Sequence, residues 1–457
     1  MRHIATIKIE SLTPSAIGGP DPNTHDDIFR VTSLRGLAAW WLRAIVSGAA
    51  YDKGDKNHDE KAIQAQKRVF GATSKSSLII IKTKAENRRE VNTQSIITIK
   101  GPKAKAKTTK KDQKTEVKHI RLQLLMMGRR DFSKKLESML KNFDSTINVY
   151  SSAKTQKLEE VLGLHAIILS LLLEGLGKGS RRGLGAVKPS LVNLSPEVKK
   201  ILQNEGCRGL LELSSKGVNE NTLKMIIDDA RTIAEKMLEN GTLGKIQAEK
   251  QSHPPKIPSL SKSAAEIYIK RLEELRNAQS NEDRLAKLNT ILKKLFLRSV
   301  ENLESLPNKL QGIDVQKNVL DATALGSYIL GLPRAAKPQK EHRYSVTFNT
   351  RTTSTVTARF VNFVPKDPKK QYSGFAKIVK IGDKGRYEHY RRPSPVIVSL
   401  LDEQTVVITF LKSSDWPEEL QWFTTREKEV EARGINDAYK QVSEYLSKNY
   451  QKIWPCD

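Results

Sequence analysis

The stretch from Leu158 to Val192 reads LEEVLGLHAIILSLLLEGLGKGSRRGLGAVKPSLV and holds a helix, a loop and a strand in succession. Residues 158–174 are apolar nearly all round, which is typical of a helix buried in a sheet-backed core. Residues 175–185 contain five glycines and three basic residues, and residues 186–192 predict a short strand. We expect His165, on the apolar stripe of the helix, to be a core residue with its hydrogen bonds satisfied.

The preceding residues supply the rest of one folding unit. Residues 3–10 alternate apolar and polar side chains, which predicts a half-buried strand. A helix begins after Thr32 or Ser33, and residues 77–82 and 95–99 are rich in β-branched residues, which predicts two further strands. With residues 158–192 these elements give a β-α-β-β-α-β order, the ferredoxin-like arrangement.

The glycine-rich loop has the composition of a phosphate-binding loop. Its spacing fits neither the Walker loop nor the dinucleotide fingerprint, because Lys178 is followed by glycine and the loop follows a helix. What remains is a flexible basic turn, in which the backbone and Lys178, Arg181 and Arg182 are compatible with a nucleic-acid backbone. A mobile surface loop with solvated charges is the open alternative.

Composition favours a nucleic-acid partner. The 457 residues include 78 Lys and Arg against 51 Asp and Glu, a net charge of +27, and the length predicts two or three domains. The longest apolar run is too short to span a bilayer, so we expect a cytoplasmic protein without membrane association. Two cysteines, Cys207 and Cys456, and no paired histidine motif give no reason to expect a metal or a cofactor.

The second half of the chain predicts a second domain of related type. Residues 196–203 and 221–240 read as helices, residues 263–303 as a charged helical region, and residues 426–449 as a final helix. Residues 396–401 and 406–411 predict a hairpin. In the first half, residues 100–118 hold eight lysines and no aromatic residue, so we expect a disordered insertion there.

Two further segments are candidates for RNA contact. The first predicted helix has a face with Gly36, Trp40 and Arg43, flanked by Arg35, and a glycine inside a helix suggests that something approaches the backbone closely. That neighbour is either RNA or another part of the chain, and Trp40 is either a stacking platform or a packed residue. Residues 387–392 end in Tyr390, Arg391 and Arg392 and interleave aromatic with basic residues, as a single-strand binding surface or an ordinary strand does.

Several motifs together resemble the RAMP superfamily of CRISPR-associated RNA-binding proteins. They are Thr13-Pro14 with Gly18-Gly19, Ser33-Leu-Arg-Gly36 with Trp40-Trp41-x-Arg43, and the loop 175–185. The double tryptophan resembles one branch of that superfamily, the first-numbered subunit of the Cmr complex, a type III-B RNA-guided effector. Residues 331–334 and 391–395 are similar to segments in that subunit's second half.

The resemblance implies an α+β fold with two tandem ferredoxin-like (RAMP/RRM-like) domains and with helical and basic insertions. We expect the first domain over residues 1–200, with a basic insertion at about 83–118. The second is expected over residues 201–457, with a helical insertion at about 220–305.

The resemblance also implies a non-catalytic head subunit in antiviral defence. Such a subunit contacts the 3′ region of the guide RNA, helps to capture target RNA, and assembles with the other Cmr subunits. On this reading the loop's basic residues contact phosphates, Arg35 and Arg43 extend the basic surface, and three glycines permit close approach of the backbone: Gly177, Gly179 and Gly183.

Two other classes of function stay open. Some relatives of this superfamily cut RNA without a metal, and His25, Asp26 and Asp27 form a compact acid and base cluster in the loop after the first strand. The alternative is therefore a metal-independent endoribonuclease. A basic scaffold or membrane-surface protein is disfavoured because the sequence shows no long cationic amphipathic helix with an aromatic apolar face.

Overall fold

The computed structural model describes most of both halves of the chain. The described residues are 1–17, 30–89, 91–92, 96–100, 114–117, 140–153, 157–250, 253–296, 319–320, 372–376, 378–381, 386–389, 394–415, 420–424, 429–432 and 435–455. Within these ranges, no helix has the length and apolar character needed to cross a membrane.

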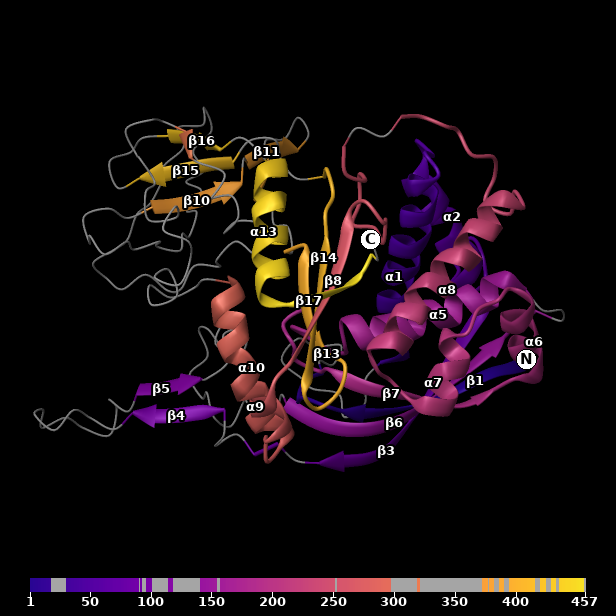
Figure 1. Ribbon diagram of the computed structural model, residues 1–457, viewed down its shortest axis with the longest axis horizontal. Coiled ribbons are helices and arrows are strands. Elements are labelled where there is room, and N and C mark those ends of the chain that lie inside the picture. The colour runs from indigo at the N-terminus through magenta and orange to yellow at the C-terminus, as the bar shows by residue number, and fades with distance from the viewer. Residues whose placement is uncertain are drawn as a thin grey trace, which may run out of the picture.

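The first half folds around one antiparallel sheet (Figure 1). Its elements in chain order are β1 Arg2–Ser11, β2 Ser15–Ala16, α1 Val31–Asp52, α2 His58–Val69, β3 Ile79–Arg89, β6 Leu140–Ser151, α5 Leu158–Leu173 and β7 Val187–Leu194. The long strands lie in the order β3-β6-β1-β7, and β2 pairs with the beginning of β6. This order with its two crossover helices confirms the predicted ferredoxin-like arrangement. Its third strand, however, is β6 and not the strand predicted at residues 95–99. That segment forms β4 Ile97–Lys100, which pairs with β5 Lys114–Val117 outside this sheet.

The second half repeats the same topology. Its elements are β8 Ala265–Arg271, α9 Glu273–Arg276, α10 Asn281–Phe296, β13 Val396–Leu400, β14 Thr405–Leu411, α13 Ile435–Asn449 and β17 Gln451–Trp454. The strands lie in the order β13-β14-β8-β17, and β13 with β14 forms the predicted hairpin. The α+β class and the two tandem ferredoxin-like units are therefore confirmed.

The two units stack so that the second sheet is covered on both faces. Along β14, Val407 and Leu411 belong to the core shared with α1 and α5, whereas Val406, Ile408 and Phe410 pack with α10 and α13. Figure 1 shows α13 on one side of this sheet and α5 with α8 (Glu220–Glu239) on the other. Helix α5 is consequently surrounded by apolar partners, which explains why its sequence is apolar nearly all round.

Three helices follow the first sheet: α6 Pro196–Asn204, α7 Gly209–Lys216 and α8. The hydroxyl of Ser195 accepts a hydrogen bond from the Val198 amide at 3.3 Å and caps α6, and Asn219 caps α8 in the same way. The helices predicted over residues 196–203 and 221–240 are confirmed. Apolar residues of α6, α7 and α8 join the core of the first unit. The domain boundary expected near residue 200 stays a prediction.

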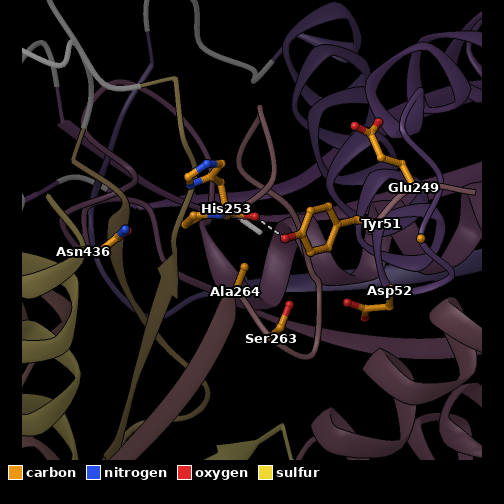
Figure 2. Close-up of a pocket in the computed structure, with 9 residues that line it drawn as sticks. Tyr51, Asp52, Glu249, His253, Ser263, Ala264 and Asn436 are labelled. Atoms are coloured by element: carbon orange, nitrogen blue, oxygen red, sulfur yellow. Dashed lines mark hydrogen bonds between the residues drawn. The ribbon is translucent and has the colours of Figure 1, made fainter. Parts of the chain in front are cut away.

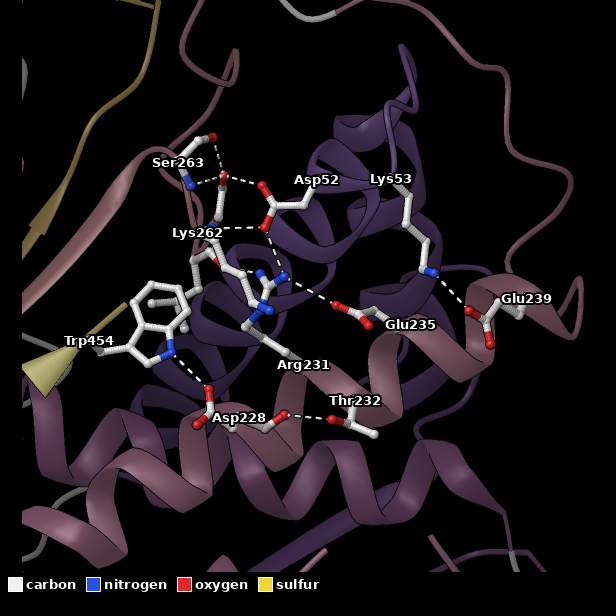
Figure 3. Close-up of polar contacts among 12 residues, drawn as sticks. Asp52, Lys53, Asp228, Arg231, Thr232, Glu235, Glu239, Lys262, Ser263 and Trp454 are labelled. Atoms are coloured by element: carbon white, nitrogen blue, oxygen red, sulfur yellow. Dashed lines mark hydrogen bonds and ion pairs between the residues drawn. The ribbon is translucent and has the colours of Figure 1, made fainter. Parts of the chain in front are cut away.

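A buried arginine ties the end of the chain to this helical layer (Figure 3). The guanidinium of Arg231 on α8 lies 2.8 Å from Asp52 Oδ2 and 3.1 Å from Glu235 Oε1, with 3% of its side chain exposed. It also lies 5.7 Å from the ring centroid of Trp454, whose indole N–H donates to Asp228 Oδ1 at 2.9 Å. These contacts join α1, α8 and β17.

Three expectations from the sequence were wrong in part. Residues 265–271 form the central strand β8 rather than helix, because Ile267 and Ile269 face one core and Tyr268 faces the other. Part of the expected insertion at 83–118 is ordered: residues 83–89 continue β3, and β4 Ile97–Lys100 pairs with β5 Lys114–Val117. The last helix begins at Ile435, after strand β16 Glu429–Ala432.

The remaining strands are β9 Val319–Leu320, β10 Tyr372–Ala376, β11 Ile378–Ile381, β12 Arg386–His389 and β15 Leu420–Thr424. They form two small sheets, one with the order β10-β15-β16-β9 and one in which β11 pairs with β12. In sequence, most of this material lies between α10 and β13, so it is an insertion into the second ferredoxin-like unit.

Candidate nucleic-acid interface

The glycine-rich loop leaves α5 and returns to the sheet as β7. Glycine is required at both exposed and buried positions, because Gly177 and Gly183 have positive φ values of 93° and 75°. A Cβ at Gly177 would lie 2.7 Å from the carbonyl oxygen of Ala16, and a Cβ at Gly183 would lie 2.2 Å from Leu288 Cδ2. Close packing within the chain therefore accounts for these two glycines.

The loop is a folded joint, unlike the flexible turn expected from its composition. The Lys178 amide donates to Ala16 O at 2.8 Å, and the hydroxyl of Thr13 donates to Gly183 O at 2.7 Å. Gly183 is buried, whereas Gly177 and Lys178 are exposed and Gly179 is half-buried. Only the tip, residues 177–179, projects to solvent.

The two arginines of the loop have different surroundings. Arg181 Nε lies 3.3 Å from Glu174 Oε1, and its guanidinium stacks 4.6 Å from the ring centroid of Trp40. Arg182 instead donates to Val396 O on β13 at 2.8 Å, and the Arg181 carbonyl accepts from the Val398 amide at 3.2 Å. Arg181 thus lies beside α1, while Arg182 holds the edge of the second sheet.

The tandem tryptophans of α1 separate into a core residue and a surface residue. Trp41 is fully buried, and its indole N–H donates to Glu174 Oε2 at 3.2 Å. Trp40 is half-buried, with its ring edge-to-face on Trp41 at 5.1 Å and Arg181 over it. Trp40 therefore combines a packed edge with a partly exposed ring.

Arg35 and Arg43 contact α2 or the residue that follows it. Arg35 donates to the carbonyl oxygen of Phe70, and Arg43 donates to Gln66 Oε1. Burial lowers the pKa of the Arg43 guanidinium from its ordinary value. Gly36 is exposed, and no atom of the described residues lies within 4 Å of where its Cβ would be. The close neighbour expected at Gly36 is thus not among the described parts of this chain.

The structure brings part of the predicted site together as one surface. We call Gly36, Trp40, Lys178 and Arg181 the loop surface: Gly36 lies one helical turn before Trp40, and Arg181 joins that turn to the loop. Across the described part of the chain, the amides of Gly177 and Gly179 meet no hydrogen-bond acceptor. Main-chain amides beside a lysine and a stacked arginine are suited to phosphate and to an aromatic base.

Other predicted residues lie outside the described ranges. They are the weak catalytic candidates His25, Asp26 and Asp27 and the aromatic and basic segment Tyr390, Arg391 and Arg392. Among the residues that are described, no group of three or more histidine, cysteine or carboxylate side chains is arranged to hold a metal ion.

A pocket that the sequence did not indicate lies at the other end of α1 (Figure 2). It has a volume of about 620 Å³, and the Tyr51 hydroxyl at its wall donates to the carbonyl oxygen of His253. Asp52 is already engaged by Arg231 and by the Lys262 amide. The lining residues are Tyr51, Asp52, Gly54, Glu249, His253, Pro254, Ser263, Ala264 and Asn436.

Comparison with protein families found a match in the first half of the chain. Residues 8–188 match the family model described as RAMP superfamily. Among curated proteins, no match to the sequence was found.

Two solved structures share the fold over nearly the whole chain. A chain in the cryo-EM structure of the Type III-B Cmr-beta bound to cognate target RNA has 15% sequence identity and a TM-score of 0.51, with 98% of this chain and 99% of that chain covered. A second such structure, with AMPPnP and in the presence of ssDNA, gives 13% identity, the same TM-score of 0.51, and coverage of 98% and 99%. The crystal structure of Cmr1 from Pyrococcus furiosus in its apo form has 16% identity and a TM-score of 0.48, covering 99% and 98%.

Proposed function

We propose that this chain is an RNA-binding subunit of a type III-B (Cmr) RNA-guided effector, because residues 8–188 match the family model described as RAMP superfamily. The shared fold with a chain of the Cmr-beta structure supports the proposal, and so does the net charge of +27. On this proposal its partners are guide RNA, target RNA and the other Cmr subunits, and its role belongs to antiviral defence.

The loop surface carries the proposal. Its exposed tip offers the Lys178 ammonium and two main-chain amides, and Arg181 and Trp40 extend it with a guanidinium and a ring. Phosphates are met by the amides and cations, and a base stacks against the exposed part of the ring. Gly36 adds a stretch of α1 without a side chain, so that a strand of RNA can approach the helix backbone.

Within the complex, we assign this subunit a non-catalytic role near the 3′ region of the guide RNA. The loop surface presents cations, an aromatic ring and main-chain amides, which are groups that bind phosphates and bases, so the surface is suited to binding and positioning. The proposal therefore places strand cleavage in other subunits.

Isolation from the native cell tests the proposal. The tagged full-length chain is purified gently at low salt, and bound RNA is extracted, sized and sequenced. We expect small RNAs of defined length together with other Cmr subunits. Recovery of the chain alone, or with RNA of random length and sequence, would contradict the assignment.

The nuclease alternative has a separate test, because its candidates His25, Asp26 and Asp27 lie in a different segment from the loop surface. Purified chain is incubated with labelled single-stranded RNA with and without magnesium. We expect no cleavage. Specific cleavage that disappears when all three residues are replaced by alanine would establish the nuclease instead.

A further inference from the structure

The two sheets of the molecule differ in what covers them. Both faces of the second sheet are buried, one by α10 and α13 and the other by the helices of the first unit. The first sheet has α1 and α5 on its inner face. At its outer face, α10 contacts the Asn142 end of β6 through Asn281 and Glu282, and no other described element is recorded there. Apart from that end, this is the one open face of a ferredoxin-like sheet among the described residues.

The outer face carries an aromatic pair on its two central strands. Tyr150 of β6 and His3 of β1 are half-buried, register partners, and arranged edge-to-face with ring centroids 5.5 Å apart. The ammonium of Lys82 on β3 lies 5.3 Å from the Tyr150 ring centroid. Four-stranded sheets that bind single-stranded RNA stack bases on aromatic side chains displayed in this way.

Basic residues surround the pair on the same face. Lys82, Lys84 and Lys8 are exposed, and among the described residues none of the three forms an ion pair. Lys84 and Lys8 both pair in register with Thr146, so they lie two strands apart, a separation of about 10 Å. The face therefore presents separated cations beside stacking rings.

Polar and acidic groups define the limits of this surface. Thr6 donates to Asn148 Oδ1 at 2.9 Å and forms a neutral polar rung between the aromatic pair and the lysines. The carboxylate of Glu86 accepts a hydrogen bond from Thr146, between Lys84 and Lys8. The carboxylates of Glu10 and Asp144 lie at the far end, where Asp144 is 3.0 Å from Arg89. The acidic groups therefore lie beside Lys84 and Lys8 and at the far end, away from the aromatic pair.

We propose that the basic and aromatic end of this outer face, formed by His3, Lys8, Lys82, Lys84 and Tyr150, is a second binding surface for single-stranded RNA. The proposal rests on the proposed function, since it adds a second contact for the same class of partner. Bases stack on Tyr150 and His3, and phosphates meet the three lysines. An acidic protein partner would use the lysines but would not require rings on the two central strands.

This surface is remote from the loop surface. The loop contacts Ala16, which pairs with Leu140 at the beginning of β6, and Tyr150 lies ten residues further along the same strand. Ten residues of strand span about 33 Å. Changes at the two surfaces should therefore act independently on RNA affinity.

Binding of labelled single-stranded oligouridine to the full-length chain tests the proposal. We expect Tyr150→Ala to weaken binding about fivefold or more, the low end of one base stack, and Tyr150→Phe to retain it. Lys82→Ala with Lys84→Ala should reduce the magnitude of the slope of log affinity against log salt by about 1.4. The matched control is Lys199→Ala with Lys200→Ala, two exposed lysines on α6.

Photocrosslinking identifies the residues that contact RNA, a measurement that does not depend on the overall stability of the fold. Oligouridine with 4-thiouridine should crosslink to Tyr150 or His3 in the wild type and in a Lys178→Glu variant. Thermal unfolding shows whether each variant is folded. If Tyr150→Ala does not fold, Tyr150→Phe and the double variant Lys82→Ala with Lys84→Ala still test the proposal.

Four outcomes distinguish the second RNA-binding surface, the proposed function and a protein interface. Weaker binding in the sheet variants with crosslinks at Tyr150 or His3 supports the second surface. If the folded sheet variants keep wild-type affinity while Lys178→Glu loses affinity, the second surface is overturned but the proposed function stands. Absence of RNA binding by the wild type overturns both. Wild-type RNA binding by sheet variants that no longer join other subunits would make the face a protein interface.

Discussion

The guanidinium of Arg182 donates a hydrogen bond to the main-chain oxygen of Val396, 2.8 Å away and on the other ferredoxin-like unit. The neighbouring Arg181 carbonyl accepts from the Val398 amide at 3.2 Å, so the loop continues the edge of the second sheet. Arg181 turns its own side chain the other way, toward Glu174 and Trp40. Arg182 therefore joins the two units, and Arg181 is part of the loop surface.

Replacing Arg182 tests the structural half of this division. Arg182→Ala removes a charge-assisted hydrogen bond to a buried strand, and we expect the free energy of unfolding to fall by about 1–2 kcal/mol. Urea unfolding measures the loss. The control Lys199→Ala, on an exposed turn of α6, should leave stability unchanged, and equal stability of the two variants would contradict the role of Arg182.

On the proposed function, Glu174 competes with phosphate for Arg181. Its Oε1 lies 3.3 Å from Arg181 Nε and its Oε2 lies 3.2 Å from the Trp41 indole nitrogen. Glu174→Gln retains an acceptor for the indole but removes the charge. We expect tighter binding of single-stranded RNA by about two- to fivefold, and a salt slope steeper by about 0.7 as one more cation meets phosphate.

The measurement for Glu174→Gln is a titration of labelled RNA at several salt concentrations. Weaker binding by a folded variant would show that Glu174 holds Arg181 in its binding orientation. The competition with phosphate would then be wrong.

Arg231 stabilises the junction of α1, α8 and the last strand. Removing one member of a buried ion pair leaves the other charge uncompensated, so Arg231→Met should lower the free energy of unfolding by about 3 kcal/mol or more. Lys53→Ala is the matched control, because Lys53 and Glu239 form an exposed pair 2.7 Å apart in the same region (Figure 3). Such pairs contribute at most about 1 kcal/mol. Similar losses in both variants would contradict the account.

Buried His165 makes stability depend on pH. Burial lowers its pKa from 6.5 to about 4, and its Nδ1 donates to Val161 O at 2.8 Å. His165 is a core residue as expected, but its Nε2 has no hydrogen-bond partner among the described residues, so the expectation that its hydrogen bonds are satisfied was wrong in part. The folded state binds fewer protons than the unfolded chain between these values, so stability is fully present above pH 6.5 and is lost as the pH falls toward 4.

His165→Leu isolates this effect. Asp229 acts in the opposite direction, since burial raises its pKa to about 6 and favours the folded state at lower pH. Asp229 is present in both wild type and His165→Leu, so its contribution cancels in the difference between their free energies of unfolding. We expect this difference to change by about 3 kcal/mol between pH 7 and pH 4. A constant difference would show that His165 is not buried in its neutral form.

Local patterns predicted several elements correctly. The alternation of residues 3–10, the apolar helix after residue 158 and the hairpin at 396–411 all appear in the structure. The strand at 265–271 was missed because both of its faces are buried and because charged helical segments follow it, so no alternation of apolar and polar residues marks it.

The loop shows why the candidate site was predicted only in part. Its composition indicated an exposed basic turn, which holds for Lys178. Contacts between distant residues decide the rest: Gly183 is buried against Leu288 of α10, and Arg182 is held by β13. Nothing in the local sequence distinguishes Arg181 from Arg182. Their separation depends on the packing of the second unit.

The central claim is that the loop surface binds RNA, and the affinity of the full-length chain for labelled single-stranded RNA tests it most directly. Wild type is compared with Lys178→Glu and with the matched charge reversal Lys199→Glu on α6. We predict that log affinity falls linearly with log salt, that Lys178→Glu weakens binding about tenfold or more, and that Lys199→Glu has a smaller effect. Equal losses in the two folded variants, or an affinity unchanged by salt, would contradict the claim.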